Sequence, residues 1–135
     1  MNIRIEKCPA YHDDRGDLIQ FVTNKVLAEE GLPFGQVYLL TFNSIGIVRG
    51  NHYHNHSSEM FCLISGSVEM TFEDVETKQR IEKIIAINHT EFFRILIGPK
   101  IAHSIKSLSE FAVLVSFSSK EYNMNEEDKI SYPLT

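Results

Sequence analysis

The chain has 135 residues, of which 43% are hydrophobic and 23% charged, as in one ordinary globular domain rather than a disordered or coiled-coil protein. The formal net charge of −5 comes with no cluster of Lys or Arg, so neither a nucleic-acid partner nor a membrane surface is expected. Cys8 and Cys62 form no CxxC pair, and neither a signal peptide nor a membrane span is recognisable, so we predict a cytoplasmic protein.

The elements are predicted to be nearly all β, because short apolar or alternating runs recur with turn residues between them. We expect strands at residues 18–22, 37–42, 60–64, 68–73, 80–86, 92–97 and 111–117, and one brief helix at 24–30. Residues 119–128 are polar and acidic and are predicted to form an exposed C-terminal extension, helical or not. Many short strands with tight connections favour a sandwich or barrel.

The run 68–73 shows the clearest period of two in the chain. Its apolar side chains are predicted to be buried: Val68, Met70 and Phe72. Its polar side chains alternate with them and are predicted to face water: Glu69, Thr71 and Glu73. This strand is therefore expected to form one wall of the barrel.

The pattern that says most about chemistry lies between Gly46 and Gly66. Two histidines, His52 and His54, are two residues apart on a predicted strand, so both imidazoles point to one face. A polar turn follows them, and Glu59 beyond it can fold back to meet them. Two imidazoles and one carboxylate that face the same way can hold a divalent transition metal with positions open for substrate.

A further candidate ligand, His103, follows the turn at Gly98-Pro99. In a jelly roll, distant strands meet on the inner face, so His103 can complete a set of three histidines and one glutamate. The alternative to a functional site is purely structural: two histidines whose hydrogen bonds are satisfied within the strand, and a Glu59 that is exposed to water. The complete spacing favours a functional site, and the apolar run after Glu59 indicates a carboxylate that points inward and needs a cation or a hydrogen-bond donor.

The segment from Gly46 to Gly66 resembles the first motif of the cupin superfamily, and Gly98 to His103 resembles its shorter second motif, without the usual glycine before the histidine. Four motifs in order resemble cupins that act on nucleotide-linked 4-keto sugars: Asp14-Arg15-Gly16-Asp17-Leu18, Val37-Tyr38, Arg49-Gly50-Asn51-His52-Tyr53-His54 and Pro99-x3-His103. That group includes 3,5-epimerases and 3,4-ketoisomerases of dTDP-4-keto-6-deoxyhexoses and the cupin domain of bifunctional capsular-polysaccharide enzymes.

The resemblance implies an all-β fold, a single cupin jelly-roll barrel (double-stranded β-helix) over residues 1–135 with a short polar extension from about residue 119. It implies an isomerase or epimerase acting on a nucleotide-linked 4-keto-6-deoxy sugar in surface-polysaccharide biosynthesis. His52, His54 and Tyr38 would be catalytic, and Arg49 and Arg15 would bind the substrate. For Arg15, an exposed turn cation is an equal alternative to a diphosphate or dimer contact. For Tyr38, a plain strand aromatic stays open as an alternative.

Glu59 decides between two mechanisms that exclude each other. The similar ketoisomerases commonly carry a non-acidic residue there and work without metal, whereas the capsular cupin domains keep a glutamate and are associated with zinc. The resemblance therefore implies one divalent transition metal on His52, His54, Glu59 and His103, zinc before iron, manganese or nickel, and no organic cofactor. A metal-bound imidazole nitrogen cannot also take a proton, so Tyr38 would then be the leading candidate for the base.

Two other classes of function stay open. An iron-dependent cupin oxygenase would use the same set of three histidines and one glutamate. A non-catalytic cupin would bind a sugar or another small ligand without turnover. In each case we expect a homodimer, because small cupins frequently cover their barrel edges with a second subunit.

Overall fold

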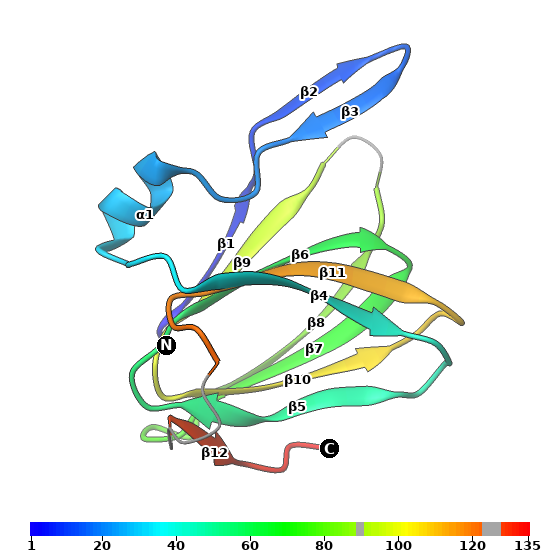
Figure 1. Cartoon of the computed structure of the whole chain (residues 1–135). Helices are drawn as coiled ribbons and strands as arrows, with labels where there is room; N and C mark the ends of the chain where they lie inside the picture. Colours follow the sequence, from blue (N-terminus) through cyan, green and yellow to red (C-terminus); the bar gives the residue numbers. More distant parts are fainter. Residues whose placement is uncertain (89–90, 123–127) are drawn as a thin grey trace.

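The structure is a computed structural model that describes residues 1–88, 91–122 and 128–135, and it consists mainly of two antiparallel sheets packed face to face (Figure 1). The first sheet has the strand order β1-β9-β6-β11-β4 and the second has the order β12-β5-β10-β7-β8. Their bounds are β1 (Ile3–Lys7), β4 (Gln36–Phe42), β5 (Val48–His54), β6 (Glu59–Ser65), β7 (Ser67–Asp74), β8 (Arg80–Ala86), β9 (Phe93–Ile97), β10 (Ile101–Ser107), β11 (Ala112–Ser118) and β12 (Lys129–Ser131). The predicted jelly-roll barrel is confirmed.

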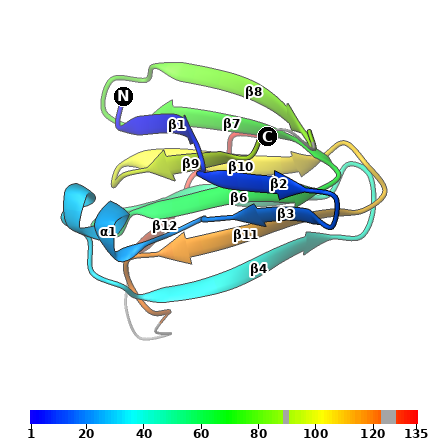
Figure 2. The same ribbon diagram turned by 90° about the horizontal axis from the view of Figure 1, so that it is seen from above.

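A hairpin and a helix lie on the outer side of the first sheet (Figure 2). The hairpin consists of β2 (Ala10–Asp13) and β3 (Gly16–Ile19), and the helix is α1 (Asn24–Glu30). Thr23 caps the N-terminus of α1 by accepting a hydrogen bond from the Val26 amide, and Gly31 ends the helix in the left-handed conformation. The helix prediction is therefore confirmed at both ends. Within the described ranges, no helix is long and apolar enough to cross a membrane.

Three strand predictions need correction. The strand predicted at 18–22 ends at Ile19, because its pairing partner in the hairpin is the four-residue β2. The short strands β1, β2 and β12 were not predicted. β2 and β12 are too short to show a periodic pattern, whereas the alternation of Ile3 and Ile5 with charged residues in β1 was overlooked. The strand β7 buries Val68, Met70 and Phe72 as expected. Thr71 is buried as well, which corrects its predicted exposure, since β7 is covered on both edges by β10 and β8.

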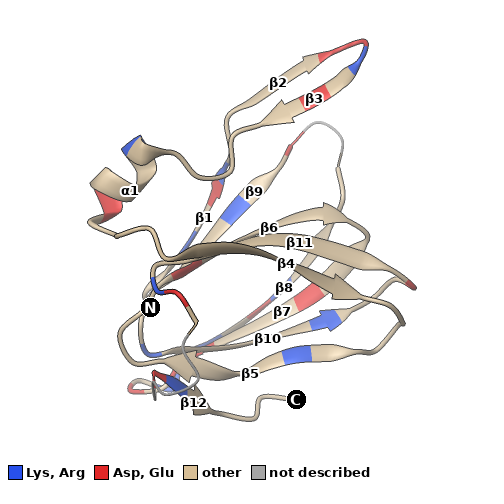
Figure 3. Ribbon diagram, in the orientation of Figure 1, with Lys and Arg blue, Asp and Glu red and all other residues tan. Residues whose placement is uncertain are grey.

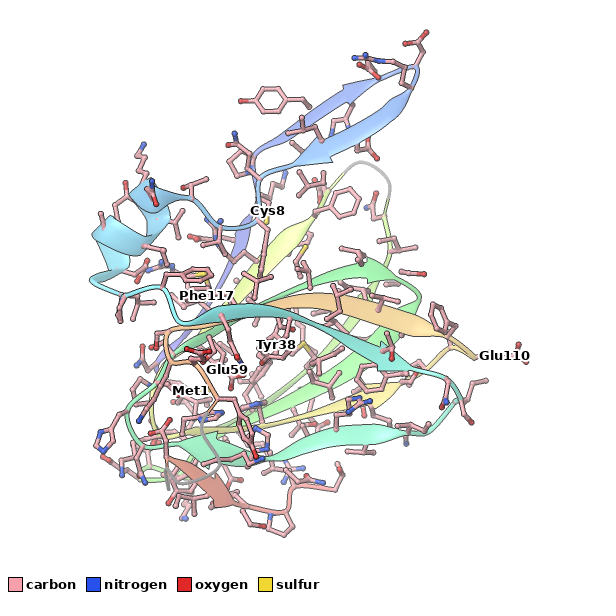
Figure 4. The ribbon with its side chains drawn as sticks, in the orientation of Figure 1. Met1, Cys8, Tyr38, Glu59, Glu110 and Phe117 are labelled. Atoms are coloured by element: carbon pink, nitrogen blue, oxygen red, sulfur yellow. The ribbon has the colours of Figure 1, made fainter. Side chains whose placement is uncertain are left out.

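The apolar core fills the space between the two sheets and ends at a polar cluster. It is built from these buried side chains: Phe42, Phe61, Leu63, Val68, Met70, Phe72, Ile95, Ile97, Ile101, Ile105, Ala112 and Leu114. The Phe61 ring lies 5.8 Å from the imidazole of His103, centroid to centroid, and so marks the boundary of the core. Figure 4 places Tyr38 and Glu59 beside each other in the interior, between the two sheets.

The C-terminal segment is only partly the exposed extension that was expected. Glu121 and Tyr122 are exposed as predicted, whereas residues 123–127 lie outside the described residues. Asp128 is buried, with 9% of its surface exposed, which corrects the prediction for this residue. The cause is the pairing of β12 with β5, which carries Asp128 to the turn that follows β5, where the Asn55 amide donates to its backbone carbonyl.

The two glycines that flank the histidine motif differ in how well they should tolerate substitution by alanine. Both have a positive φ, +88° at Gly46 and +83° at Gly66, which costs an alanine about 1–3 kcal/mol. A Cβ at Gly66 would in addition lie 2.3 Å from the Phe111 carbonyl oxygen, whereas a Cβ at Gly46 would contact nothing within 4 Å. We therefore expect Gly66→Ala to lower the free energy of unfolding by clearly more than Gly46→Ala, as measured by urea denaturation. Equal losses would contradict this assignment.

Candidate active site

Two strands of each sheet carry the candidate residues to the inside of the barrel. His52 and His54 lie on β5, His103 lies opposite His52 on β10, Glu59 begins β6, and Tyr38 lies on β4. All five line one cavity of about 700 Å³. The sequence prediction that these residues share a site is thus consistent with their placement.

The two histidine strands pack against each other at Gly50 with no room for a side chain. Gly50 and Asn51 both have a positive φ, +95° and +58°, and the register between β5 and β10 shifts beside them. A Cβ at Gly50 would lie only 2.7 Å from the backbone oxygen of His103. Glycine therefore permits the contact that brings the His52 and His103 rings to a centroid distance of 4.7 Å.

Glu59 is the centre of the polar contacts in the cavity. Its side chain is buried, and Tyr38 Oη donates a 2.6 Å hydrogen bond to its Oε2. The other oxygen, Oε1, lies 2.8 Å from His54 Nε2 and 3.4 Å from His103 Nε2. Burial opposes ionisation of the carboxyl, but these donors and charges outweigh it and lower the pKa of Glu59 to about 2. The site therefore holds a carboxylate at neutral pH.

Each of the three imidazoles has its Nδ1 beside an oxygen. His52 Nδ1 lies 3.1 Å from the Gly50 carbonyl, and His103 Nδ1 lies 3.4 Å from the Ile101 carbonyl. His54 Nδ1 lies 3.2 Å from a carboxylate oxygen of Asp128. These oxygens are acceptors, so Nδ1 is the protonated nitrogen of the neutral His52 ring, and its Nε2 is free in the cavity. His54 differs, because an ionisable carboxylate lies beside each of its two ring nitrogens, Asp128 at Nδ1 and Glu59 at Nε2.

The donor set fits a divalent metal ion. One ligand atom from each of His52, Glu59 and His103 lies within 4.8 Å of the others. His54, the fourth predicted ligand, falls outside that group, although its Nε2 is near Glu59 Oε1. His54 Nε2 and Glu59 Oε1 are buried, and neither has a hydrogen-bond partner of acceptable geometry. A cation between these atoms would satisfy both.

The protonation states differ among the candidate groups. Burial and the neighbouring His103 lower the pKa of His52 to about 4, and burial likewise lowers the pKa of His103. Both rings are therefore neutral at pH 7 and can bind metal or accept a proton. Burial also opposes protonation of His54, but Glu59 and Asp128 outweigh it and raise its pKa. Burial and the Glu59 charge raise the pKa of Tyr38, which therefore remains a proton donor.

The two predicted substrate-binding arginines lie in different places. Arg49 lines the cavity, where its Nε donates to the Thr41 carbonyl and its guanidinium lies 5.5 Å from the centre of the Phe42 ring. Arg15 lies at the tip of the β2–β3 hairpin, paired with Asp13 and outside the cavity of its own chain. Figure 3 shows the described Lys and Arg residues spread over several elements rather than gathered in one stripe.

Sequence reasoning missed several polar residues that line this cavity, and Asp128 and Ser57 are the two that contact the candidate site. Asp128 Oδ2 contacts His54 and accepts a 2.5 Å hydrogen bond from Ser57 Oγ, and both residues line the cavity. Ser57 lies in the polar turn before Glu59 and could have been suspected from its position. Asp128 gave no comparable signal, because it lies 74 residues from His54 in an acidic stretch.

Solved structures with the same fold include enzymes of nucleotide-sugar metabolism. The sugar 3,4-ketoisomerase QdtA from Thermoanaerobacterium thermosaccharolyticum, in complex with TDP, is 22% identical with a TM-score of 0.80, over 96% of this chain and 88% of that one. The dTDP-6-deoxy-D-glucose-3,5-epimerase RmlC from Legionella pneumophila is 19% identical with a TM-score of 0.80, over 96% and 72%. The capsular polysaccharide assembling protein CapF from Staphylococcus aureus is 23% identical with a TM-score of 0.68, over 94% of this chain and 34% of that one.

At these identities the likeness establishes a shared fold and confirms the resemblance found in the motifs. No curated protein matches the chain. One protein family does, and the match extends over residues 11–130, from the hairpin to β12. Because that match includes most of the sequence, the protein belongs to the family described as the polysaccharide biosynthesis C-terminal domain.

Proposed function

We propose that the protein is an isomerase or epimerase of a nucleotide-linked 4-keto-6-deoxy sugar in surface-polysaccharide biosynthesis. The observation that carries the proposal is one cavity lined by a neutral imidazole, His52, and a protonated phenol, Tyr38. The similar folds of a ketoisomerase and an epimerase that act on such sugars support the same chemistry. The size of the cavity, about 700 Å³, suits a ligand as large as a nucleotide sugar.

The reaction begins with removal of a proton from the carbon beside the carbonyl. A base accepts this proton, and a donor stabilises the oxygen of the enediol that forms. If a proton returns to the former carbonyl carbon, whose oxygen keeps the proton it received, and the neighbouring hydroxyl loses its own proton, the carbonyl moves by one carbon. If a proton returns to the original carbon on the opposite face, and the carbonyl oxygen gives its proton back, that carbon is inverted. In the metal-free protein His52 Nε2 would accept the proton, because its Nδ1 faces Gly50, and Tyr38 would donate to the carbonyl oxygen.

A metal ion would change the division of these roles. His52, Glu59 and His103, together with His54, would hold one divalent ion, zinc before iron, manganese or nickel. Such an ion would polarise the substrate carbonyl as a Lewis acid. His52 would then be occupied as a ligand, and Tyr38 would be the remaining residue of the predicted catalytic set in the cavity. Its raised pKa suits a proton donor and opposes the role of base that was expected for it from the sequence.

The negative diphosphate of a nucleotide sugar is complementary to Arg49, a cation in the wall of the cavity. Arg49 presents a planar guanidinium there, and its five donors match the oxygens of a diphosphate. Its Nε is held by the Thr41 carbonyl, so the orientation of the group is fixed before substrate binds. Arg15 would contribute only to the cavity of a second subunit, since it lies outside the cavity of its own chain.

The first prediction concerns turnover. Incubation with dTDP- or UDP-linked 4-keto-6-deoxy sugars in deuterium oxide should introduce deuterium at C3 or C5, as followed by NMR. Tyr38→Phe and His52→Gln should lower kcat by a factor of about 10²–10⁴, because each removes a proton-transfer group. His56→Gln, which changes an exposed histidine of the turn after β5, should leave kcat unchanged. Failure of every tested sugar nucleotide to exchange would contradict the proposed function.

The second prediction concerns metal content. Protein purified without chelators should contain about one zinc per chain by elemental analysis, and Glu59→Gln should weaken zinc binding at least about tenfold. Glu82→Gln on the exposed side of β8 is the matched control and should bind zinc normally. Stoichiometric iron with oxygen uptake would instead favour the oxygenase. If the protein is active without metal, the metal-bound mechanism is contradicted and the histidines are the proton-transfer groups.

We also propose that the protein is a homodimer that pairs through the outer face of the first sheet. Exposed apolar side chains occur there on the edge strand β4, where Val37 and Leu39 are 51% and 63% exposed, and on β6, where Ile64 is 44% exposed. Open strand edges with apolar side chains are costly in water, and a second copy would cover them.

Light scattering after gel filtration should therefore give twice the mass of one chain. Leu39→Glu should shift the protein to a monomer, because it buries a charge in the interface. Ile84→Glu, at an equally exposed position on β8 of the other sheet, should leave the dimer intact. A wild-type protein that is monomeric at all concentrations tested would refute the proposal.

A further inference from the structure

Two cysteines lie outside the cavity and have no part in the chemistry proposed above. They are the only cysteines of the sequence, Cys8 and Cys62, and both are free and buried, with 5% and 1% of their surface exposed. Cys62 follows Phe61 on β6, and because side chains alternate along a strand, it points away from the cavity that Phe61 lines. Cys8 directly follows β1, and Figure 4 places it at the base of the β2–β3 hairpin.

The two thiols contact each other from different strands. Cys8 is tied to the start of β9, since its amide donates a 2.8 Å hydrogen bond to the Phe92 carbonyl. On the other side of β9, the pairing with β6 ends at Phe61 and Ile95, one residue before Cys62. Near that point the Cys62 thiol donates a hydrogen bond to the sulfur of Cys8. The fold therefore brings together two thiols that are far apart in the sequence.

A buried cation lies near the pair and makes the two thiols unequal. Arg94 donates to the Glu6 carboxylate through Nε and Nη2, and to the Phe21 carbonyl through Nη1 at 2.6 Å. The hydrogen bond from Cys62, aided by the charge of Arg94, lowers the pKa of Cys8 against the effect of burial. The same hydrogen bond and burial raise the pKa of Cys62. Cys8 is therefore the thiol that ionises first, and Cys62 keeps its proton.

We propose that Cys8 and Cys62 are a redox-sensitive pair that forms a reversible intramolecular disulfide and so joins the base of the hairpin to β6. A thiol that ionises readily, with a second thiol in contact with it, is the arrangement that a reversible oxidation requires. No third cysteine exists in the sequence to compete for the bond. Because the pair lies outside the cavity, the inference does not rest on the proposed function.

A peroxide is the class of oxidant that the pair would meet. The Cys8 thiolate attacks one oxygen of hydrogen peroxide and breaks the O–O bond, which leaves a sulfenic acid on Cys8 and, after protonation of the released hydroxide, one water. The sulfur of Cys62 then displaces the hydroxyl of the sulfenic acid, and its proton leaves with that hydroxyl as a second water. An external dithiol reverses the oxidation by thiol–disulfide exchange.

The bond would act on the hairpin, because Cys8 is the residue directly before its base. The Gln20 amide donates a 2.9 Å hydrogen bond to the Pro9 carbonyl and closes that base. An isolated two-stranded hairpin is only marginally stable, so its base depends on what anchors it. The strand β6, which carries Cys62, is the middle strand of the first sheet. A disulfide would therefore attach the hairpin to the most central strand available.

The test is oxidation of the reduced full-length chain with hydrogen peroxide in the presence of a chelator. Mass spectrometry without reductant should show a loss of about 2 Da, the mass of the two hydrogens that a disulfide lacks, and one peptide that joins Cys8 to Cys62 after proteolysis. Dithiothreitol should restore both thiols. A chain that keeps both thiols, a disulfide between two chains, or oxidation to sulfinic acid without a disulfide would overturn the inference.

Two serine variants test the different roles of the thiols. Cys62→Ser keeps a hydroxyl that can donate to Cys8 but cannot form the disulfide, so peroxide should leave Cys8 as a sulfenic acid that dimedone traps. Cys8→Ser should keep Cys62 as a free thiol under the same conditions. Equal trapping in both variants would contradict the assignment of Cys8 as the nucleophile. If either variant does not fold, the peptide map of the wild type still decides whether the bond forms.

Hydrogen exchange tests the effect on the hairpin. The Gln20 amide should exchange at least about tenfold more slowly in the oxidised protein than in the reduced protein, because opening of the hairpin base is restricted. The Lys78 amide, which donates to the Asp74 carbonyl in a turn of the other sheet, is the internal control and should exchange equally in both forms. Equal exchange of Gln20 in both forms would refute the attachment of the hairpin.

Discussion

The buried negative charge of Glu59 is the constraint on which the rest of the site depends. Transfer of a carboxylate from water to the interior costs several kcal/mol unless donors or cations surround it. This protein supplies a phenol from β4 and imidazoles from β5 and β10, so that one side chain draws together three strands of both sheets. The apolar core ends where this cluster begins, and the polar interior is therefore confined to one region of the barrel.

The protonation states of Tyr38 and His52, near the charge of Glu59, differ. Tyr38 is held protonated beside the carboxylate, whereas His52 is neutral because of burial and the adjacent ring of His103. A donor and an acceptor of protons thus exist together at neutral pH without any group having to carry an unfavourable charge. This combination suits both a Lewis-acid site and an imidazole base, and the occupancy of the cluster by metal selects between them.

The part of the site that the sequence predicts is the part controlled by strand periodicity. The spacing of His52 and His54 places both on one face, and the apolar residues after Glu59 predict that it points inward. His103 was predicted only through the jelly-roll topology, and its place opposite His52 required the register of β10 on β5. Asp128 could not be predicted, because the pairing of the three-residue β12 leaves no pattern in the local sequence.

The close approach at Gly50 has a consequence for the selectivity of the site. The separation between His52 and His103 is determined by how near two backbones can come, and that limit is the hydrogen atom that glycine carries in place of a methyl group. The spacing of the two imidazoles therefore depends on a residue with no side chain to offer. A change of specificity in this barrel can arise from backbone spacing while every functional group remains in place.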